Sequence, residues 1–332
     1  MDPLTQATLG AAAAQAAARP KRFLAATLAG AAGGFLPDAD VLIRSSTDPL
    51  LSLEYHRHFT HSLVFIPIGG MLTAALCAKL SRGRASFRDL VLPATLGWGT
   101  HGLLDSCTSY GTYLYWPFSN ERVAWHVISI VDPLFTFPLL AGVIWAARKR
   151  LARITWAFLA YALLYIGLGT FQLHRAESVQ ADLIAKRGHQ PVHTEVKPSL
   201  GNHILFRAFY DHEGRYYADA IRVPWWGEAR IYEGDSIPAA DVDSFVATYE
   251  VDEVRRKDIA RFAYFSAGYL VEDPRFEGVL SDFRYAAVPN DIAPMWGIDV
   301  LGTPPGQHLE WLHFRDFRPG DTERMLEMLW GR

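Results

Sequence analysis

Hydrophobic residues are unevenly distributed along the chain. Long apolar runs fill the first 171 residues, whereas charged, aromatic and turn-forming residues alternate in the remainder. Apolar runs of this kind predict helices, which we expect at about 4–18, 23–36, 62–78, 89–104, 134–147 and 154–171. The last run has no charged residue over 18 positions and approaches the ~20 residues that cross a bilayer. The pattern predicts a mainly α fold, with a polytopic membrane bundle of about six apolar helices over residues 1–171.

After Phe171 the pattern becomes that of a water-soluble domain. An amphipathic helix is expected near 172–187, with later helices at 241–250, 253–264 and 320–330. Alternating apolar and polar residues predict strands at 202–210, 215–223, 279–287, 296–301 and 309–316. We therefore expect a smaller soluble α+β domain over residues 172–332, in which the histidines are scattered surface or strand residues.

The loops between the expected helices differ in charge. Every second loop is basic, and these loops contain Arg19, Lys21, Arg22, Lys79, Arg82, Arg84, Arg88, Arg148, Lys149, Arg150 and Arg153. Basic loops of membrane proteins face the cytoplasm, so the mainly acidic loops are expected on the other side. With six spans, the C-terminal domain would also be extracytoplasmic. The alternative, a buried bundle in a soluble protein, does not explain why basic loops recur at every second connection.

Composition excludes several other classes of protein. The net charge is −3, and we find no zinc-finger spacing, basic helix or glycine-rich phosphate loop, so no nucleic-acid partner is expected. The two cysteines, Cys77 and Cys107, form neither a metal-type pair nor an evident disulfide framework. The expected partners are the lipid bilayer and a lipid or phosphoester substrate, and the sequence does not identify a protein partner.

The residues suited to metal chemistry all fall on the acidic side. Three separate segments supply the candidate ligands Asp38, Asp40, His56, His61, His101 and Asp105, and a fourth segment begins with Asp132. His101 and Asp105 are four residues apart and therefore share one face of a helix. Imidazole and carboxylate together suit a divalent cation, Zn²⁺ first, and the absence of cysteine suits a catalytic site better than a closed structural one.

Helix electrostatics give an independent argument for a cation. Asp38, Asp40 and Asp105 lie at or just past expected C-terminal helix ends, where the helix dipole disfavours negative charge by ~0.3–1 kcal/mol each. A bound cation would remove that conflict. Asp132 is different, because Asp before Pro133 suits a helix N-cap as well as a ligand role.

Each histidine, taken alone, could simply be hydrogen-bonded, and it is the clustering that favours metal binding. His56 and His61 are the favoured pair, whereas His58 and His126 are of second rank. Arg57 is expected to pair with a carboxylate or with an anionic group of a substrate.

These motifs resemble those of the YdjM-like family, inner-membrane proteins regarded as metal-dependent hydrolases. The resemblance covers roughly the first 150 residues and runs through Met1 to Thr5, Leu36 to Asp40, His56 and Arg57 with Thr60 to Ser62, His101 with Asp105, Tyr110 with Gly111, and Ile130 to Pro133. It implies location in the inner membrane and a distant relation to zinc-dependent phospholipase C and single-strand nucleases. A helical scaffold and phosphoester hydrolysis would follow by analogy.

Three positions depart from that family pattern. Gln6 stands where the family often has His, so one metal ligand is replaced by a poorer one and fewer ions are expected. His58 stands where a small residue is expected, and His126 where Asn or Asp is expected. Either histidine could compensate for Gln6 or be incidental.

Two functions of different class are consistent with the sequence. The first is a membrane-bound hydrolase of an ester or phosphoester, with a lipid as one candidate substrate, in which a metal-activated water attacks the ester. Asp40 or Asp132 would take the proton, while Arg57 would stabilise the developing oxyanion. The alternative is a non-catalytic membrane protein with a structural metal site and a partner-binding C-terminal domain. A transporter is a weaker third option, because the ionisable residues gather at one face and not at the bilayer midplane.

Overall fold

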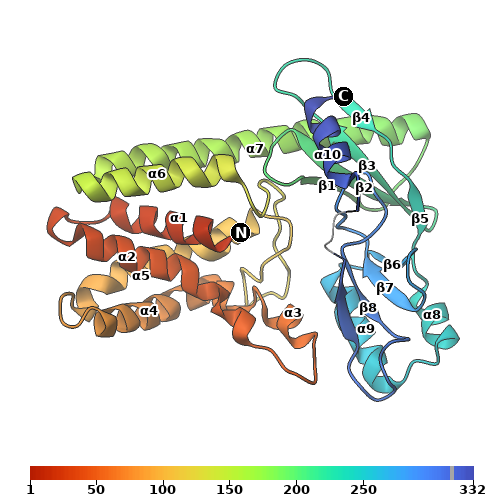
Figure 1. Cartoon of the computed structure of the whole chain (residues 1–332), viewed down its shortest axis with the longest axis horizontal. Helices are drawn as coiled ribbons and strands as arrows, with labels where there is room; N and C mark the ends of the chain where they lie inside the picture. Colours follow the sequence, from red (N-terminus) through yellow and green to blue (C-terminus); the bar gives the residue numbers. More distant parts are fainter. Residues whose placement is uncertain (315–317) are drawn as a thin grey trace. The chain divides into compact units, whose positions relative to one another are not determined.

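The computed structural model describes residues 1–314 and 318–332, which form two compact units (Figure 1). The helical unit comprises Met1–Leu42, Tyr55–Phe171 and Leu200–Asn202. The sheet unit comprises Ile43–Glu54, Gln172–Ser199 and His203–Arg332. A short segment from the N-terminal half therefore belongs to the sheet unit.

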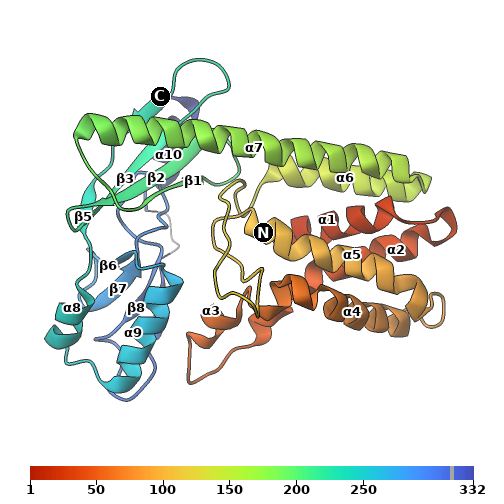
Figure 2. The same cartoon turned by 180° about the vertical axis from the view of Figure 1, so that it is seen from behind.

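Helices form at all six places where the apolar runs predict them. They are α1 (Pro3–Ala16), α2 (Phe23–Phe35), α4 (Ile66–Leu80), α5 (Phe87–Ser106), α6 (Pro133–Lys149) and α7 (Ala152–Arg187). Between them lie the short helix α3 (Leu51–Tyr55) and the 3₁₀ turns η1 (Pro20–Arg22), η2 (Leu36–Leu42), η3 (Phe59–His61) and η4 (Leu63–Phe65). Figure 2 shows the same helices from behind.

Local sequence explains where two of these helices begin. The Asp2 side chain accepts a hydrogen bond from the Thr5 amide, and Pro3 occupies the first turn of α1. The Asp132 side chain accepts hydrogen bonds from two amides at the start of α6, which also opens on a proline. Both are N-caps followed by a residue that needs no amide partner.

Small residues allow the helices of this unit to approach closely. A Cβ atom added at Gly97 of α5 would overlap the Gly30 carbonyl of α2, and one at Gly34 would overlap the Gln6 carbonyl of α1. Glycines at such contacts bring helix backbones together. The result is that α5 lies against α1, α2 and α4.

The expected bundle of about six membrane-spanning helices is wrong. Two helical stretches are long and apolar enough to cross a membrane among the described residues, namely Leu63–Leu80 and the helix Ala152–Arg187. With 14 and 13 residues, α1 and α2 are only about 20 Å long, short of the ~30 Å hydrocarbon core. The 20 residues of α5 include buried His101 and Asp105, and such groups lower its hydropathy.

The expected smaller α+β domain also needs correction, because two antiparallel sheets dominate a large sheet unit. The first sheet has the order β1-β2-β3-β4, with β5 also paired to β3. Its strands are β1 (Thr194–Pro198), β2 (Leu205–His212), β3 (Arg215–Arg222), β4 (Arg230–Tyr232) and β5 (Ser236–Pro238).

The second sheet has the order β6-β7-β8-β9. Its strands are β6 (Leu270–Glu272), β7 (Val279–Asp282), β8 (Trp296–Asp299) and β9 (Glu310–His313), and the helices of the unit are α8 (Val242–Thr248), α9 (Glu253–Phe265) and α10 (Asp321–Trp330). Each of the five predicted strands overlaps an observed one, although residues 315–316 of the last lie outside the described residues.

The second half of α7 belongs to the core of the sheet unit. Leu173 and Ala176 are buried in one cluster with Val196, Phe206 and Ile221 of the first sheet. Because this part of α7 is covered by strands, its amphipathic pattern differs from the uniformly apolar pattern before residue 171.

Candidate metal centre

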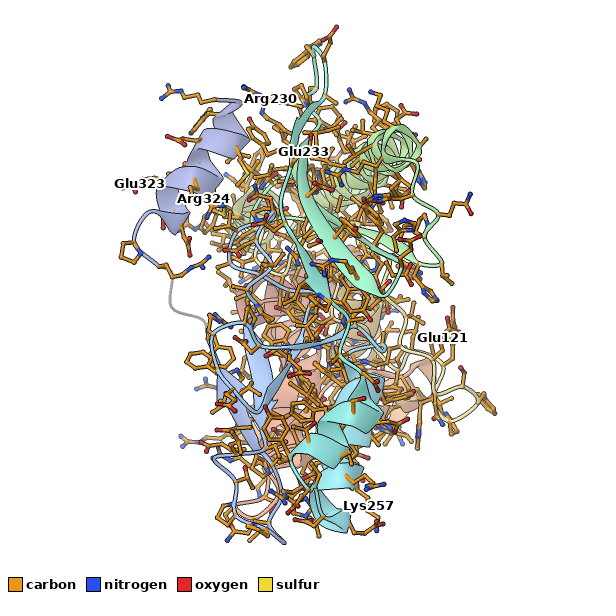
Figure 3. All side chains as sticks on the ribbon, turned by 90° about the vertical axis from the view of Figure 1, so that its right-hand side faces the viewer. Glu121, Arg230, Glu233, Lys257, Glu323 and Arg324 are labelled. Carbon is orange, nitrogen blue, oxygen red and sulfur yellow. The ribbon has the colours of Figure 1, made fainter. Side chains whose placement is uncertain are left out.

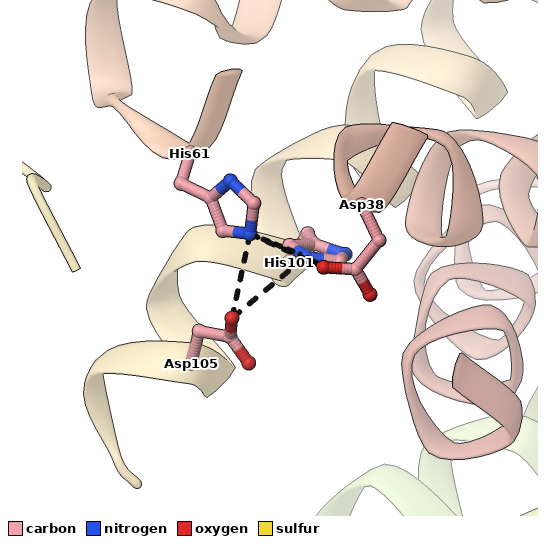
Figure 4. A group of neighbouring side chains, drawn as sticks. All are labelled: Asp38, His61, His101 and Asp105. Atoms are coloured by element: carbon pink, nitrogen blue, oxygen red, sulfur yellow. Dashed lines mark hydrogen bonds and ion pairs between the residues drawn. The ribbon is translucent and has the colours of Figure 1, made fainter. Parts of the chain in front are cut away.

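Four side chains from three separate segments converge in the helical unit (Figure 4). Asp38 comes from η2, His61 from η3, and His101 and Asp105 from α5. One ligand atom of each residue lies within 4.8 Å of the others. The side chains of His61, His101 and Asp105 are fully buried, whereas that of Asp38 is 19% exposed.

The distances between these atoms fit a single small cation. The two Nε2 atoms of His61 and His101 are 2.9 Å apart. Asp38 Oδ1 lies 3.5 and 3.3 Å from them, and Asp105 Oδ2 lies 3.4 and 3.9 Å from them. Ligands about 2.1 Å from a tetrahedral zinc ion are about 3.4 Å apart, so the four atoms already approximate such a shell.

Hydrogen bonds to the opposite ring nitrogens orient both histidines. His101 Nδ1 is 2.6 Å from the Gly34 carbonyl, which can only accept, so Nδ1 carries the proton and Nε2 faces the centre. His61 Nδ1 lies 3.2 Å from Asp40 Oδ2 and 2.9 Å from Thr60 Oγ1. Partners of this kind fix the tautomer of metal-binding histidines.

The two oxygens of the Asp105 carboxylate also have different roles, since one accepts supporting hydrogen bonds and the other faces the centre. Its Oδ1 accepts hydrogen bonds from Gln6 Nε2 at 2.8 Å and from the Met1 amino group. Its buried Oδ2 accepts no hydrogen bond within the described residues, although Arg57 Nε is 3.2 Å away. A buried carboxylate oxygen in that position is suited to a cation.

Electrostatics in the cluster favour one extra positive charge. Burial alone would lower the pKa of His61, but the carboxylates of Asp105, Asp38 and Asp40 outweigh it and raise that pKa to about 10. Burial and the charge on His61 lower the pKa of His101. The pKa of Asp105 is lowered because Arg57 and its other positive neighbours outweigh the opposing effect of burial. The cluster thus holds a proton at a place where a metal cation would satisfy the same carboxylates.

A second group of possible ligands adjoins the first and shares Asp38 with it. Its other members are Asp40 and His56, whose Oδ1 and Nδ1 atoms are 2.8 Å apart. Asp40 Oδ2 also accepts hydrogen bonds from the Arg57 amide at 3.0 Å and from the Thr60 hydroxyl at 2.8 Å. Asp40 is therefore well supplied with donors and positions its neighbours, while the His56 side chain is 37% exposed.

Comparison with known proteins agrees with this arrangement of motifs. A model of the family described as YdjM inner membrane protein matches residues 1–176, which contain every residue of the two ligand groups. The chain belongs to the YdjM inner membrane protein family. Membership supports a location in the inner membrane.

Two curated proteins are similar to the N-terminal half. Uncharacterized protein YfhP of Bacillus subtilis (strain 168) is 28% identical over 174 residues, which are 52% of this chain and 50% of YfhP. Inner membrane protein YbcI of Escherichia coli (strain K12) is 37% identical over 117 residues, which are 33% of this chain and 64% of YbcI. The matches thus span between half and 64% of these relatives. No solved structure matches, and the relation to phospholipase C and nucleases stays a prediction.

Arg57 is buried beside the candidate metal centre. Its backbone is left-handed, with φ of 65°, and its Nη1 donates to Thr108 Oγ1 at 3.1 Å. The guanidinium lies over the Tyr110 ring at 5.3 Å. With Asp105 also beside it, Arg57 pairs with a carboxylate, one of the two roles that the sequence suggests.

Other sequence candidates lie outside the two ligand groups. Asp132 accepts hydrogen bonds from the Leu134 amide and from the Tyr165 hydroxyl, as expected of an N-cap. The His58 ring packs against Tyr113 at 4.6 Å. Within the described residues neither Asp132 nor His58 joins a candidate metal group.

Some supporting residues are not recognisable from the sequence. Gln6 holds Asp105, Gly34 orients His101, and Thr60 lies beside His61. The sheet unit contains another group of possible ligands, Asp48, Asp258 and His308. The positions of that group are too far apart in the sequence to give a spacing signal. Among the supporting residues, Gln6 departs from the family pattern, which marks its position but not its role of holding Asp105.

Proposed function

We propose that this YdjM family member is a membrane-bound metal-dependent hydrolase that acts on an ester or phosphoester, with membrane lipids as the substrate class. The observation that carries the proposal is the pair of facing imidazole Nε2 atoms beside the buried Asp105 Oδ2. A bound divalent cation, Zn²⁺ first, would act as a Lewis acid and lower the pKa of a coordinated water toward ~7.

His56 is the residue best placed to exchange a proton. Its Nδ1 is fixed by Asp40, and its side chain is partly exposed, so the ring can meet water or a substrate group. Asp40 is less suited to that role because it already accepts from His56, Arg57 and Thr60. An imidazole oriented by a carboxylate is a common general acid or base.

Arg57 reduces the negative charge of the site. Its guanidinium compensates Asp105, and in a buried environment the same cation would also favour negative charge that develops on a substrate oxygen. Asp38 is the most exposed of the four central ligands. A substrate would therefore approach the centre from the side on which Asp38 lies.

The charge pattern supports an extracytoplasmic position for the site and the sheet unit of a multi-pass protein. The candidate span Leu63–Leu80 follows His61 and leads to Arg82, Arg84 and Arg88. The second candidate span, in α7, is preceded by a basic cluster, Arg148 to Arg153. If these basic ends are cytoplasmic, His61 and residue 172 lie at the opposite ends. A reporter fused after residue 332 should be active on the extracytoplasmic side, and a cytoplasmic signal would contradict this orientation.

One observation favours the non-catalytic alternative. Four protein groups surround the centre, and four protein ligands are typical of closed structural zinc sites. In that case the metal would stabilise the helices, and the sheet unit would bind a partner.

Activity and stability measured on the same samples separate these functions. The full chain in detergent is assayed on phospholipids and on a generic phosphodiester after chelation and after Zn²⁺ is added back. We expect chelation to abolish hydrolysis, Zn²⁺ to restore it, and His61→Ala with Asp105→Ala to abolish it permanently. The matched control is His174→Ala with Glu177→Ala, an exposed ion pair in α7. Full activity in the His61/Asp105 variant would contradict the proposal, and metal-dependent stability without turnover would support the alternative.

A further inference from the structure

The loop between β3 and β4 carries the most exposed large hydrophobic side chain among the described residues. This tryptophan loop, residues 224–229, contains Trp225, which is partly buried, and Trp226, whose surface is 90% exposed. Figure 3 shows the loop extending beyond Arg230, away from the strands that flank it. Exposed apolar side chains mark an interaction surface where several of them gather.

A second exposed tryptophan lies near the base of the loop. Trp330 is 70% exposed at the end of α10. The carbonyls on either side of it, those of Leu329 and Gly331, accept hydrogen bonds from Arg222 and Arg230. These two arginines flank the tryptophan loop, so the end of α10 and the loop belong to one edge of the sheet unit.

Hydrogen bonds also fix the loop to α7. Gln172 Nε2 donates to the Val223 carbonyl at 2.9 Å, and Arg175 Nη1 donates to the Pro224 carbonyl at 2.9 Å. Gln172 directly follows the uncharged run that ends at Phe171. At 1.5 Å per residue, the attachment lies only about 2–6 Å along the helix beyond that run.

We infer that the tryptophan loop inserts into the interfacial layer of the same bilayer that α7 enters. Tryptophan prefers this layer, because its ring is apolar and its N–H finds polar partners among the headgroups. The hydrogen bonds from Gln172 and Arg175 hold the loop next to the end of the uncharged run of α7, where the interfacial layer is expected. Three arginines lie at its base, Arg175, Arg222 and Arg230, and Glu228 is the one acid within residues 224–229. The charge at the loop therefore also suits lipid phosphates.

The sheet unit would then contact the membrane in two ways. One is covalent continuity with α7, and the other is the loop, which approaches the surface from a different strand connection. A pair of attachments restricts rotation of the unit about the helix axis, whereas α7 alone would leave that rotation free.

Site-specific spin labels test the position of the loop. Nitroxides are attached at Trp226→Cys and, as a matched control, at Val192→Cys in the full chain reconstituted into vesicles of phosphatidylethanolamine and phosphatidylglycerol. Val192 is also highly exposed, at 81%, but it follows the C-terminal end of α7 at Arg187. That end lies about 24 Å along the helix from residue 171, so a label at position 192 should lie in water. The unmutated chain, labelled in parallel, measures the reaction of Cys77 and Cys107.

The comparison uses collisions with oxygen, which concentrates in lipid, and with a water-soluble nickel complex. We expect the oxygen-to-nickel ratio to be several-fold higher at position 226 than at position 192. Equal, water-like ratios at the two positions would overturn the inference. A label at position 226 that is shielded from both reagents would also overturn it, because that result indicates a second copy of the chain on the loop.

Discussion

At the scale of single residues, His101 and Asp105 of the metal centre each use one polar atom for supporting hydrogen bonds and turn the other toward the centre. The Gly34 carbonyl occupies one nitrogen of His101, and Gln6 occupies one oxygen of Asp105. In each case the other atom of the side chain faces the centre. The supporting groups thus orient each of these ligands and leave its second atom available to a cation.

Asp40 is the supporting residue whose removal is most informative. Asp40→Asn keeps the shape of the side chain but removes the charge that holds His56 and His61. We expect the metal affinity to fall by about 10- to 100-fold, the usual effect of losing such support. Competition with a fluorescent chelator measures it.

Asp89→Asn is the control for that variant, since Asp89 lies at the other end of α5 and bonds to Ser86. It should leave the affinity unchanged. An unaltered affinity in Asp40→Asn would mean that Asp40 does not orient the ligands.

Lys197 gives a residue-scale prediction for the sheet unit. Its ammonium group is buried, 3.0 Å from Glu195 and 4.4 Å from the centre of the Tyr285 ring. Burial, with a smaller contribution from Arg284, lowers its pKa to about 8, although Glu195 opposes the shift. Since the pKa is lower in the folded than in the unfolded chain, the free energy of unfolding should rise with pH between about 8 and 10.5.

Replacing this lysine by methionine should therefore stabilise the protein at neutral pH. We expect Lys197→Met to raise the free energy of unfolding at pH 7 by about 1–3 kcal/mol and to flatten the rise above pH 8. Denaturant unfolding of the full chain at pH 7 and pH 9.5 measures both effects. A variant that is destabilised equally at both pH values would show that the charge of Lys197 is fully compensated.

The sequence predicts the charged part of the site much better than its support. His101 and Asp105 share one helix face at a spacing of four, and that relation can be read directly. The contact of His101 with Gly34, by contrast, joins residues 67 apart through a backbone carbonyl. Nothing in the residue type of a glycine indicates such a partner, so it emerges only from the fold.

At the scale of elements, long patterns are predictable and short ones are not. All six apolar runs form helices, and β2 and β3, each of eight residues, lie where alternation predicts them. The strands β4, β5 and β6 have three residues each, too few for a period of two to be visible. The expected number of about six membrane spans failed for a different reason, because apolar composition is shared by spanning helices and by helices buried against each other.

Helix contact at the site can be tested with a pair of glycines in α5. A Cβ at Gly102 would overlap the backbone carbonyl of His61, whereas one at Gly99 would make only ordinary contact with Ile66 at 3.7 Å. We expect Gly102→Ala to separate α5 from η3, lower the melting temperature and weaken metal binding by at least tenfold.

Gly99→Ala should be neutral or stabilise the helix by up to about 1 kcal/mol, because alanine is the better helix former. Thermal unfolding and metal titration of the two variants provide the comparison. Equal behaviour would mean that the α5 backbone can move away from His61 without affecting the centre.

At the scale of the whole molecule, the two units have separate cores and separate chemistry. All the ligands of the metal centre belong to the helical unit, whereas residues 43–54 of the intervening segment belong to the sheet unit. In the sheet unit this segment is held by Arg261, which donates to Asp48 at 3.1 Å and to Glu54 at 2.9 Å. Sequence order alone would have assigned the segment to the N-terminal half, because contact with residues some 200 positions later leaves no local signal.

This division predicts where a bound metal stabilises the protein. A ligand at 100 times its dissociation constant adds about 2.7 kcal/mol to the folded state that binds it. Hydrogen exchange of the full chain, with Zn²⁺ and with chelator, should therefore slow by up to about 100-fold in α5, η2 and η3. Peptides from β1 to β9 and from residues 43–54 should not change, since their protection depends on contacts within the sheet unit. Equal protection in both units would mean that the chain unfolds as one cooperative body, and the metal would then control the stability of the sheet unit as well.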